Sequence, residues 1–166
     1  NDINGFSDEE MIDSVAETDV ALLVMCPGRV KKIYPPKKYP HIEDRVYAFF
    51  ESKLLELKNK GFQSIIIDPG IGFNKSKYEN LELVNKLHRF TDFNVPITVG
   101  ISRKGFIGTI THVEQSRDRL IGSVVAESFA AVNGVNIIRT HDVMHSLQGL
   151  KMVDALENNY KEDHNC

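Results

Sequence analysis

Four short apolar runs recur along the chain, and β-branched residues dominate them. They lie at residues 20–25 (VALLVM), 64–68 (SIIID), 96–100 (PITVG) and 135–139 (VNIIR). Apolar residues are nearly continuous within each run, which predicts strands that are buried on both faces. Strands of this kind are typical of a parallel sheet.

Amphipathic helical patterns occupy the segments between these runs. They cover residues 8–17, 43–59, 76–87, 118–132 and 142–158. Capping boxes predict two of the helix starts, Ser7 with Glu10 and Ser76 with Glu79. Asp142 is expected to cap the last helix. The chain therefore reads as one helix followed by four strand–helix units.

This strict alternation predicts parallel strands joined by right-handed crossovers. It fits a closed barrel and an open doubly wound sheet equally well, because both place their sites at the C-terminal edge of the strands. One connection is long, since residues 26–40 contain four prolines and five basic residues. We interpret it as a solvated loop; an anion-attracting loop beside a phosphorylated substrate is the less favoured alternative.

Composition limits the class of protein. The chain has 166 residues, 42% of them hydrophobic, and a net charge of −3, which suits one folded domain and argues against nucleic-acid binding. No apolar run approaches the roughly 20 residues that cross a membrane, and the start lacks signal-peptide features. Two cysteines, Cys26 and Cys166, make no disulfide framework and predict a reducing cytoplasm. The first residue, Asn1, looks like the middle of a protein.

Each apolar run ends in residues that are able to bind or react. Asp68 ends the second run, and Arg139 and His141 follow the fourth. Asp68 lies in the turn DPGIGF, where a carboxylate at the end of a buried strand must be solvated, paired or bound to a ligand. A turn-capping aspartate explains it equally well.

The third and fourth runs lead into cationic segments. GISRKGFIG, at residues 100–108, places two adjacent cations after a buried strand, which suits an anionic or electron-rich ligand, although a solvated basic turn is the alternative. Arg139 and His141 offer donors to phosphate oxygens. The alternative is that Arg139 pairs with an acidic neighbour and His141 caps the helix together with Asp142.

The remaining histidines show no metal-ligand spacing and are interpreted as surface or structural residues: His41, His88, His112, His145 and His164. The sequence contains no Ser–His–Asp order and no Walker loop.

Three ordered motifs together resemble those of dihydropteroate synthases: residues 67–73 (IDPGIGF), 100–104 (GISRK) and 139–143 (RTHDV). Residues 1–3 (NDI) also resemble the N-D-V segment that ends the family's fourth strand. The resemblance covers residues 1 to about 156. It implies an α/β fold of the (β/α)8 TIM-barrel type, here only the C-terminal half, with about strands 5–8 and the end of strand 4. Residues 1–158 would form this part of the domain, and residues 159–166 a disordered tail.

The resemblance also implies a reaction. The family is a transferase of folate biosynthesis that joins (7,8-dihydropterin-6-yl)methyl diphosphate to 4-aminobenzoate, giving 7,8-dihydropteroate and diphosphate. Diphosphate would leave first, and the arylamine would attack the pterin cation. The family implies Mg²⁺ as cofactor, a homodimer, a cytoplasmic location and a role as sulfonamide target. The magnesium ligand is expected in an N-terminal part outside these residues.

Site residues follow by resemblance. Asn1 and Asp68 would hydrogen-bond the pterin, Met25 would pack on its ring, and Lys104 would lie near its carbonyl side. Phe73 and Ser102 would line the aminobenzoate position, and Gly100 belongs to the same substrate-binding segment. The residues expected to act in catalysis, by holding or stabilising the departing phosphates, are Lys104, Arg139 and His141.

Two departures from the family remain. Cys26 follows Met25 where the family usually has histidine, and a thiol replaces neither the hydrogen bonding nor the charge of imidazole. Strands one to three are absent by resemblance, so the 166 residues alone are expected to form an incomplete, inactive site. The alternatives are a methyltetrahydrofolate-dependent methyltransferase, which does not need Lys104, Arg139 and His141, and a non-catalytic pterin-binding fragment.

Overall fold

The computed structural model describes residues 1–158 and contains the predicted alternation of strands and helices. The strands are shorter than the apolar runs that predict them: β1 (Leu22–Met25), β2 (Ile65–Asp68), β3 (Thr98–Val99) and β4 (Ile137–Ile138). β1 pairs in parallel with β2, and β3 pairs in parallel with β4. A parallel bridge between Ile67 and Ile97 joins the two pairs, and a second bridge places Asp2 beside Val24. The prediction of parallel strands is therefore confirmed.

The order of the strands separates the two folds that the alternation left open. Each strand lies beside the next strand in sequence, from Asp2 through β1, β2 and β3 to β4, and no neighbour is skipped. A doubly wound sheet reverses its order at a switch point. A barrel advances by one strand at a time, so this succession is the one a barrel requires.

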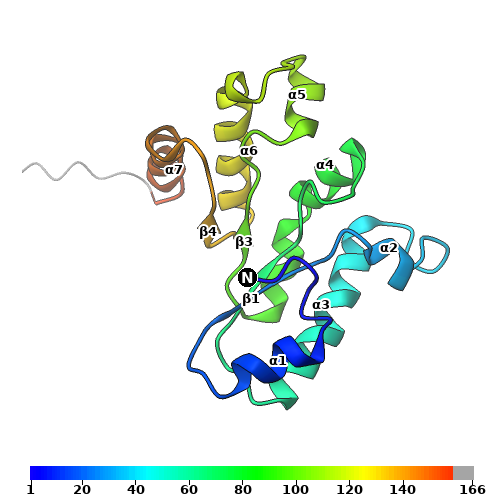
Figure 1. Ribbon diagram of the computed structural model, residues 1–166. Coiled ribbons are helices and arrows are strands. Elements are labelled where there is room, and N and C mark those ends of the chain that lie inside the picture. Colours follow the sequence, from blue (N-terminus) through cyan, green and yellow to red (C-terminus); the bar gives the residue numbers. More distant parts are fainter. Residues whose placement is uncertain (159–166) are drawn as a thin grey trace, which may run out of the picture.

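Seven α-helices and two 3₁₀ helices, η1 and η2, are formed within residues 1–158: α1 (Glu9–Ala16), α2 (Val30–Ile33), α3 (Ile42–Asn59), α4 (Lys77–Asn85), η1 (Leu87–Phe93), α5 (Gly105–Thr111), η2 (Ser116–Asp118), α6 (Leu120–Val132) and α7 (Val143–Glu157). Figure 1 shows α7 beside α6, on the opposite side of the molecule from α2. Two helices were not predicted. α2 interrupts the segment interpreted as a solvated loop, because Val30 is buried in the core. α5 follows directly after Lys104.

The longest helix, α3, supplies much of the core. Its buried side chains repeat at helical spacing and lie on one stripe: Ile42, Val46, Phe49, Phe50, Leu54 and Leu57. Full burial of an aliphatic or aromatic side chain contributes about 1.5–3 kcal/mol. The helix ends as predicted at Gly61, which has φ +93°. There the Phe62 N–H donates to the Leu57 carbonyl oxygen at 3.1 Å.

The predicted helix cap is found at α4, whereas the caps of α1 and α7 differ from the prediction. Ser76 and Glu79 form the predicted capping box at α4. At α1 the cap is Asp8 rather than Ser7, because the Asp8 carboxylate accepts the Glu10 N–H at 3.0 Å. Asp142 occupies the cap position of α7, but its carboxylate makes no capping bond because it is engaged elsewhere.

The C-terminal elements are more exposed than the patterns predicted. In α6 the small residues Ser123 and Ala130 are buried, whereas Ile121 is 80% and Val125 63% exposed. In β4, Ile137 is 42% exposed, so the prediction of burial on both faces is wrong for this strand.

The expected tail, residues 159–166, lies outside the described residues. Within residues 1–158, every helix is too short or too polar to cross a membrane.

Candidate functional site

The site is built on the C-terminal ends of the strands. Met25 and Asp68 are register partners at the ends of β1 and β2, and both are buried. Paired residues of parallel strands present their side chains on the same face of the sheet. Two hydrogen bonds fix Asp68, one at its side chain and one at its main chain. Its Oδ1 accepts the Gly70 N–H at 2.8 Å, and its carbonyl oxygen accepts the Cys26 N–H at 2.8 Å.

The turn after Asp68 requires glycine at two positions. Gly70 has φ +70° and Gly72 has φ +83°, a region that side chains disfavour. A Cβ at Gly70 would collide with the Cys26 carbonyl oxygen, and one at Gly72 would lie 2.7 Å from Lys104 Cδ. The glycines therefore let the turn approach the loop after β1 on one side and Lys104 on the other.

Lys104 lies between this turn and the end of β4. Its Nζ is 4.4 Å from the centroid of the Phe73 ring, a cation–π contact. The pKa of Lys104 is lowered by burial and then by the positive charge of Arg139, while Asp68 opposes the shift. Lys104 thus contacts Phe73, and the charges of Asp68 and Arg139 act on its ammonium group.

Arg139 lies over Gly100. A Cβ at Gly100 would be 2.8 Å from Arg139 Nη2, so glycine leaves the space that the guanidinium occupies. Arg139 is exposed and has no ion-pair partner within residues 1–158. The alternative in which an acidic neighbour neutralises Arg139 is therefore wrong for the described part of the chain.

Ser102 joins the ends of β3 and β4. It is 4% exposed, and its Oγ accepts the His141 N–H at 3.2 Å and the Thr140 hydroxyl at 3.4 Å. The hydroxyl therefore fixes the segment that carries His141, whose own side chain is exposed. Its predicted contact with aminobenzoate stays a prediction.

Several charges near the strand ends act on Asp68. Burial raises the pKa of Asp68, and this is opposed by the Gly70 hydrogen bond and then by the charges of Arg139, Lys104 and Lys75. Lys104 lies against Gly72 in the turn after β2, and Arg139 lies against Gly100 after β3. These contacts are compatible with a single site for Asp68, Lys104 and Arg139, which stays a prediction.

Lys75 was not predicted, although it lies close to Asp68. Its Nζ donates to the Gly70 carbonyl oxygen at 2.7 Å, and burial lowers its pKa. Lys75 follows the glycine turn in the sequence, but no periodicity marks it, and its position depends on how the turn folds back. The electrostatic interactions of Lys75 with Cys26 and with Asp68 oppose this lowering of its pKa.

Cys26 belongs to the core rather than to the lining of the site. Its side chain is fully buried, and burial raises the pKa of its thiol to about 12. The thiol is therefore neutral at physiological pH. Where the family usually has imidazole, this chain places a small apolar group, and the charge of Lys75 acts on it.

One predicted site feature differs from the structure, and another, the pterin contact of Asn1, stays a prediction. Of the two adjacent cations after β3, only Lys104 faces the site. Arg103 instead makes a bidentate ion pair with Asp142, with Nε–Oδ2 at 3.0 Å and Nη2–Oδ1 at 2.6 Å. Asn1 is exposed and precedes the bridge of Asp2 to Val24, which places it beside β1; Figure 1 shows the N-terminus there.

Comparison with known proteins links this geometry to an enzyme family. A model of the family described as pterin binding enzymes matches residues 1–141. The dihydropteroate synthase of Escherichia coli K12 is 33% identical over 158 residues, which are 93% of this chain and 56% of that protein. The bifunctional dihydropteroate synthase/dihydropteroate reductase of Helicobacter pylori is 34% identical, covering 95% of this chain and 41% of that protein. This chain therefore spans about half of the length of these relatives.

Solved structures agree with the sequence matches. Dihydropteroate synthase of Stenotrophomonas maltophilia superposes with a TM-score of 0.86 at 30% identity, covering 97% of this chain and 62% of that one. The Thermus thermophilus enzyme, solved in complex with 6HMPPP, gives a TM-score of 0.83 at 33% identity, covering 95% of this chain and 63% of that one.

Proposed function

This chain belongs to the pterin-binding enzyme family, and from this premise we propose that it forms part of a dihydropteroate synthase. The reaction would join (7,8-dihydropterin-6-yl)methyl diphosphate to 4-aminobenzoate. A C–N bond forms, the C–O bond to diphosphate breaks, and the amine loses a proton to solvent. The observation that carries the proposal is that Asp68 ends β2 beside Met25, while Lys104 follows β3 and Arg139 follows β4, in a chain of this family.

Asp68 is suited to the pterin. A pterin edge presents a ring N–H beside an exocyclic amine, and a carboxylate accepts both. Only one oxygen of Asp68 is used by the Gly70 N–H, so acceptor capacity remains. Met25, at the same level of the sheet, supplies an apolar and polarisable surface for the ring. Asn1 stays a predicted contact of the same ligand.

The cations are suited to the leaving group. Lys104, Arg139 and His141 follow β3 and β4, and Arg139 is exposed without an ion-pair partner in the described chain. As diphosphate departs, negative charge develops on its oxygens, and fixed cations stabilise that charge. Phe73, which contacts Lys104, and Ser102 would border the aminobenzoate. The arylamine is neutral and nucleophilic, so the reaction needs no strong base.

The described part of the site does not suit a magnesium ion. Asp68 is the carboxylate that ends β2, and the charges of Arg139, Lys104 and Lys75 act on it. A cation among three positive side chains would be repelled. The expectation that the magnesium ligand lies outside this segment therefore stays a prediction, and no step is assigned to the ion.

Several further features belong to the proposal. We propose that these residues form the C-terminal half of a barrel and are inactive alone. The exposure of Ile137 on β4 supports this, because a strand inside a complete barrel is covered. A homodimer is supported by exposed apolar residues on α6 and α7, including Ile121 and Met144, and sedimentation of the protein would reveal a monomer if it is wrong. A cytoplasmic location and sensitivity to sulfonamides stay predictions.

The alternatives make different demands on the same residues. A methyltetrahydrofolate-dependent methyltransferase needs the pterin-binding carboxylate but no phosphate-binding cations. Lys104 and Arg139 point the site toward a phosphorylated ligand and disfavour this alternative. A non-catalytic pterin-binding fragment would keep Asp68 and lose turnover.

Turnover by the protein that carries this chain tests the proposal. Supplied with dihydropterin diphosphate, 4-aminobenzoate and Mg²⁺, it should release diphosphate and dihydropteroate in equal amounts. Lys104→Ala should lower kcat/KM by roughly a hundredfold, since it removes a charge that stabilises the departing group. Lys151→Ala, on the exposed side of α7, should leave the rate unchanged. Methyl transfer from methyltetrahydrofolate, or binding without turnover, would contradict the proposal.

A further inference from the structure

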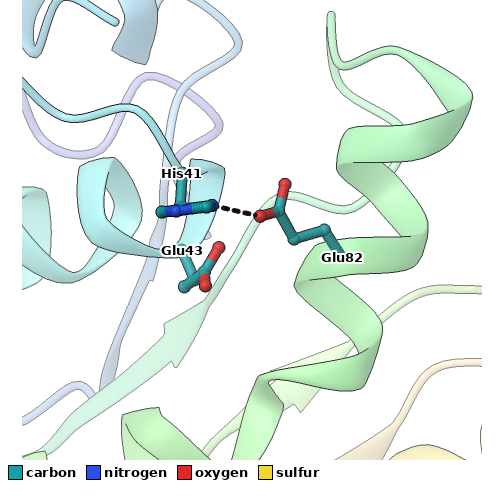
Figure 2. A group of neighbouring side chains, drawn as sticks. All are labelled: His41, Glu43 and Glu82. Carbon is teal, nitrogen blue, oxygen red and sulfur yellow. Dashed lines mark hydrogen bonds and ion pairs between the residues drawn. The ribbon is translucent and has the colours of Figure 1, made fainter.

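A second group of polar side chains lies away from the strand ends, where α3 faces α4. It consists of His41, which caps α3, Glu43 in its first turn, and Glu82 on α4 (Figure 2). His41 Nδ1 is 2.9 Å from Glu82 Oε1. One ligand atom from each of the three side chains lies within 4.8 Å of the others. Figure 2 shows the imidazole and both carboxylates turned toward a common space.

Glu43 is the unusual member of this group. The residue is 6% exposed, yet its Oε2 is buried without a hydrogen-bond partner among the described residues. Its other oxygen, Oε1, is 3.7 Å from Arg89 Nη1, and that guanidinium makes its short contact of 2.7 Å with Asp44 instead. A buried carboxylate oxygen without a partner is costly, so its presence points to a missing ligand.

We propose that His41, Glu43 and Glu82 bind a divalent zinc ion. One imidazole nitrogen and two carboxylates are a donor set that zinc accepts, with water in the remaining position. Magnesium and calcium prefer oxygen donors alone, so the imidazole favours a transition metal. The ion would satisfy the unpartnered Glu43 oxygen and replace the hydrogen bond between His41 and Glu82.

The position of the site indicates a structural role. The three ligands come from the start of α3 and the middle of α4, so one ion would tie the two helices together outside the strand ends. His41 is exposed, which leaves a path for the ion to enter. Arg89 and the N-terminus of α3 carry positive charge, which opposes a cation. We therefore expect moderate affinity.

Protons compete with the ion for the same atoms. The hydrogen bond to Glu82 raises the pKa of His41. Burial raises the pKa of Glu43; a hydrogen bond from its own backbone opposes this, and the charges of Glu82 and Asp44 add to it. Zinc binds the deprotonated forms, so its binding releases protons and weakens as the pH falls. Arg89, from η1, faces Glu43, with its Nη1 at 3.7 Å from Glu43 Oε1.

Calorimetric titration of the metal-free protein with zinc tests the inference. His164→Ala and Cys166→Ser are introduced into every sample, so that these residues do not compete as ligands. We expect one zinc ion per chain. His41→Ala and Glu82→Gln should each weaken binding by at least about tenfold, since even changes beyond the ligands cost that much. His88→Ala, which removes another exposed imidazole, should leave the affinity within about twofold.

A second measurement separates binding from misfolding. Circular dichroism should show that His41→Ala and Glu82→Gln remain folded, because both side chains are partly exposed. Zinc should raise the melting temperature of the wild-type chain and of His88→Ala but not of His41→Ala. Absence of zinc binding to the wild type, or equal affinity of His41→Ala and the wild type, would overturn the inference.

Discussion

At the scale of single residues, the glycine turn after Asp68 makes the sharpest demand. Gly70 combines φ +70° with a close approach to the Cys26 carbonyl oxygen, so a methyl group there meets both backbone strain and a collision. Gly70→Ala should therefore lower the free energy of unfolding by about 2–3 kcal/mol. Chemical denaturation measures this change.

The matched control for this change is Gly105→Ala. Gly105 begins α5 and has open space where the Cβ would lie, so alanine there should be neutral or slightly stabilising. Equal losses at Gly70 and Gly105 would show that the turn does not constrain the chain as described.

Residues differ in how far the sequence predicts them. Asp68 and Arg139 could be singled out because each ends one of the apolar runs of the sequence. Arg103 could not be separated from Lys104, because which of two adjacent cations faces the site depends on the φ of +59° at Arg103. Histidine spacing does not reveal the cluster at His41, because its partners are glutamates and Glu82 comes near only through the packing of α3 on α4.

At the scale of elements, strands and long helices could be predicted from hydrophobic pattern, and the short helices could not. α2 depends on Val30 reaching the core, which no periodic pattern announces. α6 carries apolar residues on more than one side, so its pattern did not say which side is buried. The residues that are buried are Ser123, Glu127 and Ala130.

Glu79 connects three helices through one carboxylate. Its oxygens accept from Lys31 of α2 at 2.8 Å and from Arg45 of α3 at 3.0 Å, and they also close the capping box of α4. Burial raises the pKa of Glu79, but the bonds from Lys31, Ser76 and Arg45 outweigh it and lower the pKa to about 2. The carboxylate therefore stabilises the folded chain as long as it is ionised.

Glu79→Gln should destabilise the protein by about 2–3 kcal/mol at pH 7. Glutamine keeps the capping box but leaves the buried Arg45 without its counter-charge. Because the folded pKa lies below the usual value, the difference should be complete above about pH 4.5 and fall toward zero as the pH approaches 2. Urea denaturation across this range measures it.

The control for the change at Glu79 is Glu51→Gln. Glu51 is exposed on α3, so its replacement should change stability by less than about 0.5 kcal/mol. A difference between the wild type and Glu79→Gln that stays constant from pH 2 to pH 5 would contradict the role of the ionised carboxylate.

At the scale of the whole molecule, the succession of parallel strands carries the functional argument. Pattern could predict that the strands are parallel, and hence that their C-terminal residues share an edge. It could not predict whether the edge closes into a barrel, because the pairing of β2 with β3 rests on a single bridge at Ile67 and Ile97. Family membership supports the chemistry that we propose for this edge, and Asp68, Lys104 and Arg139 are the charged residues to which we assign it.

The most direct test compares two ligands, a dihydropterin diphosphate and the corresponding pterin alcohol, by calorimetry on the protein that carries this chain. Asp68→Ala should weaken both by about a hundredfold, because it removes charge-assisted hydrogen bonds to the ring. Arg139→Ala should weaken the diphosphate by roughly tenfold or more and leave the alcohol unchanged. Unchanged binding in Asp68→Ala, or equal losses of both ligands in Arg139→Ala, would contradict a shared site for pterin and diphosphate.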